Sequence, residues 1–184
     1  MTKARLVACL LVPIWALGLL LPTAAPAAQN LFLKIPGIPG ESQDSRHKDE
    51  IEVLAYSWGV TADRNQKAAF KDFAFTKHVD QASPQLLLHA AGGQAIPAAV
   101  LLVRGAGERP EDFLTYCLTD VRVTGVSTAG STSGDRPTEE VSLSYGSFFQ
   151  TYRKQSPDGS LGAVFTGGWN IVDNLLLRAP PAAC

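Results

Sequence analysis

Residues 41–60, ESQDSRHKDEIEVLAYSWGV, divide into a charged half and an apolar half. The first ten residues are almost all polar or charged, which is typical of a solvated loop. The next ten have the composition of a β-strand, and both of its faces become apolar towards Tyr56 and Trp58. A strand with one face in water alternates more cleanly than this. The stretch therefore predicts a strand that packs against a core on one side and against something else on the other.

The chain beyond this stretch shows further short strands separated by turns. Alternation of apolar and polar residues is clear in FKDFAFTKHV, residues 70–79, and in TEEVSLSYG, residues 138–146. One helix is predicted over residues 82–93, with Ser83 at the N-cap, Pro84 in the first helical position, and a stop at Gly92 and Gly93. We therefore predict a mainly β fold, an antiparallel β-barrel that is closed or nearly closed, with one short flanking α-helix.

Length and charge favour a single globular domain. The chain has 184 residues, of which 46% are hydrophobic and 18% charged. A formal net charge of −1 gives no reason to expect a nucleic acid or an anionic membrane surface as a partner.

The first 27 residues have the three regions of a secretory signal peptide. Lys3 and Arg5 precede an uncharged apolar run, and an A-x-A pattern follows at residues 25–27. Cleavage there starts the mature chain near Ala28 and leaves 14 basic and 17 acidic side chains, a net charge of −3. The alternatives are an uncleaved membrane anchor, for which the run is slightly short, and a true start codon near residue 30.

Two cysteines stay in the mature chain once Cys9 has left with the signal. In an oxidising compartment Cys117 and Cys184 could form a disulfide. The alternative is a buried free thiol at Cys117 and an unpaired Cys184 on a Pro/Ala-rich tail.

The sequence holds no pattern that predicts catalysis. His47, His78 and His89 are scattered without the spacing of metal ligands, and neither a nucleophile elbow nor a nucleotide-binding glycine loop occurs. The acidic run DSRHKDE, residues 44–50, lacks the glycine and the glutamate spacing of an EF-hand. We therefore predict no catalytic residue, no cofactor and no metal site.

Five stretches, in order, resemble the Hcp family, the haemolysin-coregulated tube proteins of type VI secretion systems. They cover nearly all of residues 31–171 and read FLKIPGIPGESQDSRHKDEIEVLAYSWGV, FTKHVDQASPQLLLHAAGGQAIPAAVL, YCLTDVRVTGVSTAGS, DRPTEEVSLSYGSFFQTY and DGSLGAVFTGGWNI. The resemblance implies a phage tail-tube-like β-barrel over residues 28–184, with a short tail from about residue 174. It also implies a homo-hexameric ring, stacking of rings into the inner tube of an injection machine, and small effector proteins carried in the lumen. Such a protein is a structural subunit, not an enzyme, and its partners are other type VI secretion components.

The same resemblance gives a hypothesis for residues 41–60. A strand that is apolar on both faces could bury one of them against a neighbouring subunit, with the charged loop setting the register. Tyr56 and Trp58 would then anchor the interface, although both rings could equally fill the barrel core. The candidate interface residues are Glu41, Asp44, Arg46, His47, Lys48, Asp49, Glu50, Tyr56 and Trp58.

The apparent signal peptide departs from the family pattern. Members of the family are loaded in the cytoplasm and typically lack such a signal. Its presence predicts a secreted or periplasmic protein, without stable membrane association after cleavage, that could act as an exported ring binding small protein cargo. If the signal is not used, a cytoplasmic pool of tube protein is expected instead.

Overall fold

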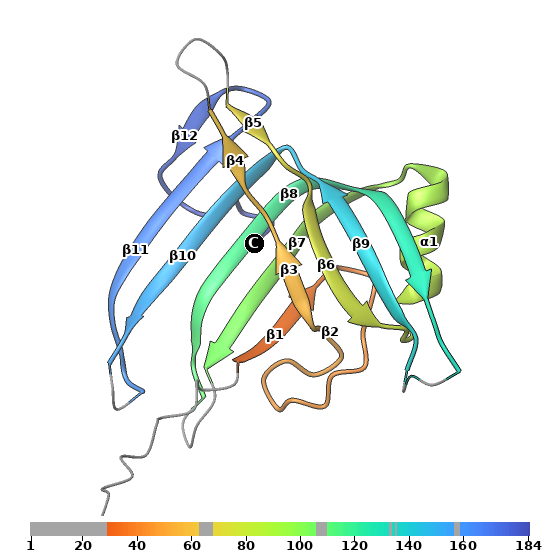
Figure 1. Ribbon diagram of the computed structural model, residues 1–184. Coiled ribbons are helices and arrows are strands. Elements are labelled where there is room, and N and C mark those ends of the chain that lie inside the picture. The colour runs from red at the N-terminus through yellow and green to blue at the C-terminus, as the bar shows by residue number, and fades with distance from the viewer. Residues whose placement is uncertain (1–28, 63–67, 106–109, 133, 135, 157–158) are drawn as a thin grey trace, which may run out of the picture.

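The computed structural model describes residues 29–62, 68–105, 110–132, 134, 136–156 and 159–184 (Figure 1). The predicted signal peptide, residues 1–27, lies outside them. The elements, in chain order, are β1 (Gln29–Lys34), β2 (Ile51–Val53), β3 (Ala55–Ser57), β4 (Val60–Thr61), β5 (Ala69–Phe70), β6 (Phe73–His78), α1 (Ser83–Gly92), β7 (Ala95–Gly105), β8 (Asp112–Ala129), β9 (Thr138–Ser144), β10 (Ser147–Gln155), β11 (Leu161–Asn170) and β12 (Leu175–Leu177). The prediction of a mainly β, antiparallel fold with one short helix is confirmed.

The strands curve round an apolar core without closing into a barrel. One path of hydrogen-bonded neighbours runs β12-β11-β10-β8-β7-β1-β2, and a second runs from β8 through β9 and β6 to β3. The two paths meet at Leu54, which separates β2 from β3 and donates its backbone N–H to the carbonyl of Thr76. Since β2 pairs with β1 and β3 pairs with β6, no ladder among the described residues joins β2 to β6. The prediction allowed a closed or a nearly closed barrel, and the sheet is not fully closed.

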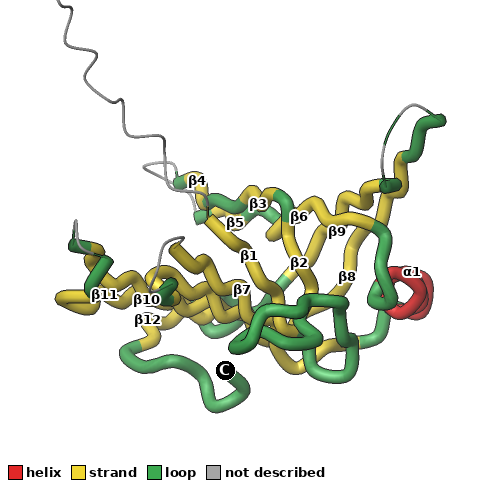
Figure 2. The backbone as a smooth tube through the Cα atoms, turned by 90° about the horizontal axis from the view of Figure 1, so that it is seen from below, coloured by secondary structure: helices red, strands yellow, loops and turns green. Residues whose placement is uncertain are grey.

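Strand β8 is the central strand of the sheet and pairs with β7, β9 and β10. It is a single strand of 18 residues, with a register shift against β9 between Val123 and Gly125. One edge pairs with β7, while the other pairs first with β10 and then with β9. The strands β10, β11 and β12 continue the sheet beyond the barrel-like part, on the side opposite to α1 (Figures 1 and 2). We call these three strands the extension.

The helix begins with a buried polar cluster rather than a side-chain cap. Ala82 occupies the N-cap position, so the prediction of Ser83 as N-cap is wrong. Ser83 is instead the first helical residue, and its hydroxyl donates to Glu139 on β9 at 2.6 Å. This bond holds the start of α1 against the sheet. The predicted stop is confirmed, because Gly93 adopts the left-handed conformation (φ 62°) that glycine tolerates best.

The end of the described chain is tied back to the sheet. Cys117 on β8 and Cys184 are joined by a disulfide, with Cα atoms 6.0 Å apart. Within the segment expected to be a tail, residues 175–177 form β12 and pair with β11. This pairing extends the sheet by one strand beyond β11.

Candidate assembly surface

The charged loop, residues 41–50, is closed at its base by backbone hydrogen bonds. Gly40 donates to the carbonyl of Asp49 at 2.8 Å, and Ser42 donates to that of Glu50 at 3.1 Å. A side chain at position 40 would collide with the backbone of Glu50 and Ile51, which explains the glycine. The loop therefore has a defined backbone conformation, which fixes the positions of its charged residues.

Asp44 organises the interior of the loop. Its Oδ1 atom accepts hydrogen bonds from the backbone N–H groups of Arg46 (2.9 Å) and His47 (3.3 Å) and from the guanidinium of Arg104 on β7. The bond from Arg46, together with the charge of Arg104, lowers the pKa of Asp44 against the opposing effect of burial. Asp44 therefore connects the loop to the sheet.

His47 is the buried histidine of the loop, and its ring lies between the carboxylates of Glu50 and Asp112. The residue is 4% exposed, and its ring stacks on Phe32 with centroids 4.4 Å apart. Nδ1 lies 3.0 Å from Oε2 of Glu50, and Nε2 lies 3.0 Å from Oδ1 of Asp112. Only a protonated ring can donate to both oxygens at once. Burial raises the pKa of Glu50, although the neighbouring His47 opposes this.

The remaining candidates in the loop are exposed. Glu41 forms an ion pair with Arg136 (3.6 Å), and Arg46 forms one with Glu111 (3.1 Å). Lys48 and Asp49 are exposed at the tip, where Asp49 has a left-handed backbone with φ 60°. The predicted interface residues thus divide into an internal set, which holds the loop together, and an exposed external set, in which Glu41 and Arg46 are ion-paired within the subunit.

Tyr56 and Trp58 both pack inside the subunit. Tyr56 stacks on Phe73, with ring centroids 5.8 Å apart, and Trp58 meets Tyr116 edge-on at 5.3 Å. The indole N–H of Trp58 donates to the hydroxyl of Tyr145. Both rings are only partly buried and lie against the core cluster. Their role as interface anchors stays a prediction.

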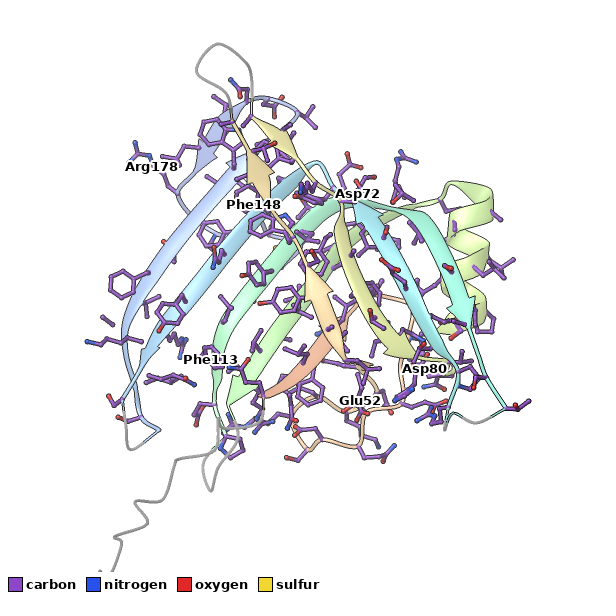
Figure 3. All side chains as sticks on the ribbon, viewed as in Figure 1. Glu52, Asp72, Asp80, Phe113, Phe148 and Arg178 are labelled. Carbon is purple, nitrogen blue, oxygen red and sulfur yellow. A yellow bond between two sulfur atoms is a disulfide. The ribbon has the colours of Figure 1, made fainter. Side chains whose placement is uncertain are left out.

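The extension carries an apolar surface that the sequence analysis missed. Residues directly opposite one another in an antiparallel sheet lie on the same face. The register therefore places Tyr152, Phe165 and Leu176 on the face that carries Phe148 and Tyr116. Nearer the barrel this face is core, since Tyr116 is 9% exposed, and Phe148 (labelled in Figure 3) packs on Trp58.

Further along the extension the same face is open. Tyr152 is 39% exposed, Phe165 58% and Leu176 58%. The rings of Tyr152 and Phe165 stack on each other, with centroids 6.4 Å apart. We call these three residues the core-side patch. The core-facing side of the sheet thus continues past the end of the core. The sequence does not show a clear alternation of apolar and polar residues here, because glycines such as Gly167 and Gly168 interrupt it.

A second apolar surface lies on α1. Leu86 points into the core and is fully buried, whereas Leu87 and Leu88 are 56% and 60% exposed. The helix and the extension lie at opposite sides of the subunit (Figures 1 and 2). The subunit therefore exposes apolar residues at two opposite sides.

The described residues offer little else that could form a functional centre. In the ranges set out above, no three His, Cys, Asp or Glu side chains gather as they would around a metal ion. Within that same part of the chain, no helix has the length and apolarity needed to cross a bilayer.

Comparison with known proteins gives consistent matches over most of the chain. The family described as "Type VI secretion system effector, Hcp" matches residues 32–152. Protein hcp1 of Pseudomonas aeruginosa is 36% identical over 159 residues, which cover 80% of this chain and 98% of that protein. The crystal structure of Hcp1 from Salmonella typhimurium superposes with a TM-score of 0.70 at 36% identity, covering 82% of this chain and 99% of that one. A type VI secretion system effector from Yersinia pestis gives a TM-score of 0.65 at 37% identity, covering 76% and 98%.

Proposed function

The chain belongs to the Hcp family of type VI secretion tube proteins, and on this premise we propose that it assembles into six-membered rings. The rings stack into the inner tube of the injection machine, and small effector proteins travel in the lumen. In this proposal the protein is a structural subunit without a catalytic site. The observation that carries the proposal is the core-side patch, an apolar face that the subunit alone leaves in water.

Burial of this patch gives a driving force for association. Exposed apolar area is a marker of interaction sites when it is contiguous, as it is for Tyr152 stacked on Phe165. Each large side chain that is fully buried contributes roughly 1.5–3 kcal/mol relative to exposure. Aromatic residues at the centre of an interface dominate its energetics, so Phe165 is the expected anchor.

The placement of the two apolar surfaces favours a ring over a two-fold dimer. A two-fold interface uses the same surface of both partners, whereas a head-to-tail interface joins two different surfaces and closes into a ring when the rotation permits. The core-side patch lies at one side of the subunit, and Leu87 and Leu88 lie at the opposite side. This geometry suits repeated head-to-tail contact between copies, and the family supplies the expected number of six.

The charged loop supplies specificity in this arrangement. Its internal set of charges is already paired within the subunit, so the exposed Lys48 and Asp49 are the residues available to a neighbouring copy. Charges at the rim of an interface set orientation and association rate more than affinity. We therefore assign the loop a role in register.

A second candidate function is an exported ring that carries or shields small protein cargo outside the cytoplasm. The observation that favours it is the disulfide between Cys117 and Cys184. Disulfides persist in oxidising compartments and are rare in the cytosol. The predicted signal peptide leads to the same periplasmic or secreted location.

Native mass spectrometry of the full chain, recovered separately from cytoplasm, periplasm and medium, tests both candidates. An unprocessed cytoplasmic hexamer supports the tube subunit, and a hexamer lacking residues 1–27 in the periplasm supports the exported ring. A monomer in every compartment contradicts the ring itself.

A further inference from the structure

The last seven residues of the sequence form a strap across one face of the sheet. Leu177, Gly168, Phe149 and Cys117 face one another in a single row across β12, β11, β10 and β8. The chain leaves β12 after Leu177 and returns along this row to the disulfide at Cys117. The segment lies on the side of the sheet away from β4 and β5 (Figure 2). We call residues 178–184 the strap.

The strap borders a groove of mixed lining, in which apolar residues such as Phe149 lie beside the charged side chains of Arg46, Glu111, Asp112 and Arg153. Cys117 and Phe149 are each 3% exposed. Pro180 and Cys184 line the same cavity of about 480 Å³ as Phe149, together with Thr115 and Thr151. A side chain at position 168 would collide with the ring of Phe149 and the backbone of Phe148, so glycine at this position leaves room for the Phe149 ring.

The disulfide is the main attachment of the strap. The backbone hydrogen bond of the strap, from Cys184 N to Pro181 O at 3.0 Å, is internal to it. Pro180 and Pro181 have no N–H to donate. Within the described ranges, no backbone hydrogen bond joins residues 178–184 to the sheet.

From these observations we propose that the Cys117–Cys184 disulfide is a thiol-exchange site, a latch that small thiols open at Cys184 to release the strap. The two sulfurs differ in access, because Cys184 is exposed and Cys117 is buried in β8. Exchange requires a thiolate to reach the sulfur that it attacks. Cys184 therefore receives the incoming group, and Cys117 is the leaving sulfur.

The chemistry balances with two equivalents of a small-molecule thiol. A thiolate bonds to Sγ of Cys184, the Sγ–Sγ bond breaks, and the electron pair leaves on Sγ of Cys117, which takes up a proton. A second thiolate attacks the reagent sulfur of the mixed disulfide and expels Cys184 as a thiolate, which is protonated in turn. The protein disulfide is reduced to two thiols while two reagent thiols are oxidised to one disulfide.

Opening the latch changes the surface and leaves the fold in place. The ladders β7–β8, β8–β10 and β10–β11 are formed by backbone hydrogen bonds that do not involve the strap. Release therefore bares the groove over Phe149 while the sheet persists. The latch does not depend on ring formation, since every group in it belongs to one subunit.

The test is glutathione labelling combined with hydrogen exchange on the oxidised full chain. Reduced glutathione is added for short times, the reaction is quenched with acid, and peptides are mapped by mass. We expect the glutathione adduct on Cys184 and none on Cys117. After full reduction with a dithiol, Cys117 becomes reactive to a maleimide in the folded protein, while the peptides of β8 and β10 keep their hydrogen-exchange protection, because their ladders do not involve the strap.

Matched variants complete the test. Cys184→Ser leaves Cys117 in a groove without a fixed cover, so a maleimide should modify it in the folded protein, as in the reduced natural chain. Cys117→Ser should leave Cys184 open to immediate alkylation. A glutathione adduct on Cys117, a Cys117 that stays unreactive to maleimide after reduction, or a loss of hydrogen-exchange protection over the whole sheet would each overturn the proposal.

Discussion

Nζ of Lys77 on β6 lies 3.1 Å from Oε2 of Glu139 on β9, and both side chains are buried. The same amine lies 2.7 Å from a carboxylate oxygen of Asp80 and donates to the hydroxyl of Ser83 at 2.9 Å. Glu139 also accepts a hydrogen bond from Thr128 on β8. One buried cation thus connects two strands and the start of α1, on the side of the subunit where Leu87 and Leu88 are exposed.

Removing this cation should destabilise the subunit strongly. Lys77→Met leaves Glu139 and Asp80 buried without their partner, which typically costs about 3–5 kcal/mol. The free energy of unfolding is measured by urea titration on Lys77→Met, on Glu139→Gln and on the double variant, which together with the natural chain form a double-mutant cycle. Lys154→Met, at an exposed position on β10, is the matched control and should be close to neutral. A loss below about 1 kcal/mol for Lys77→Met would show that the cluster is not essential.

Acid should weaken the fold through the same cluster. Burial by itself would raise the pKa of Glu139, but hydrogen bonds from Ser83 and Lys77 outweigh it and lower the pKa below its ordinary 4.5. A carboxylate with a lowered folded-state pKa stabilises the fold above its unfolded-state pKa, and this contribution is lost as the pH falls through the folded value. Urea titrations from about pH 7 to about pH 3 should therefore show falling stability below about pH 4.5. Glu139→Gln should flatten that slope, and an unchanged slope would contradict the assignment.

The core-side patch gives the sharpest test of ring formation. Phe165→Asp places a charge in the proposed interface and should weaken assembly by about 2 kcal/mol or more, roughly thirtyfold in affinity. Thr166→Asp is the matched control, because Thr166 is the next residue and lies on the opposite face of the same strand. Native mass spectrometry over a dilution series reads the ring population. Equal effects of the two variants would mean that the patch is not the interface.

Local patterns in the sequence were enough to predict the helix and strands such as β6 and β9, but not β12, which lies in the segment expected to be a tail. Phe73 and Phe75 are buried on β6, and Val141 and Leu143 on β9, as their alternation indicates. The buried face of β6 also includes Lys77, which periodicity alone could not assign to the core, because its burial depends on Glu139, 62 residues away in the chain, as well as on the nearby Asp80. The incomplete closure at Leu54 depends on pairing between strands, which no local pattern contains.

The candidate surface was harder to predict than the fold. The charged loop was visible as a run of charges, but the division between buried His47 and exposed Lys48 follows from contacts with Phe32 and Asp112. Phe165 could have been noticed as an aromatic residue in a strand rich in glycine. Its exposure, however, follows from the sheet extending past its own core, which is a tertiary property.

Removal of the hydrogen bond between Trp58 and Tyr145 tests whether Trp58 belongs to the core of the subunit or to an interface between subunits. The Tyr145 hydroxyl accepts from the indole and donates to the carbonyl of Lys71 at 3.1 Å. Tyr145→Phe leaves the indole N–H unpaired and should cost about 1–3 kcal/mol in unfolding free energy. Ring mass at saturating concentration should be unchanged if Trp58 packs only within the subunit. Loss of rings at unchanged stability would instead place Trp58 at the interface.

Two variants in the charged loop, at Lys48 and at Glu50, distinguish a role in the register between subunits from a role in the stability of one subunit. Lys48 is exposed at the loop tip, so Lys48→Glu should leave the unfolding free energy within about 0.5 kcal/mol of the natural chain. If the loop sets register, the same change should weaken ring assembly at low salt and lose its effect at about 1 M salt, where the screening length falls to about 3 Å. Glu50→Lys is different, because Glu50 accepts from His47 and is half-buried beside it, so the subunit itself should become less stable. Urea titration and native mass spectrometry on both variants distinguish these outcomes. A Lys48→Glu protein whose rings are as stable as those of the natural chain at low salt would remove the loop from the interface, and the core-side patch would then have to fix the orientation of the subunits alone.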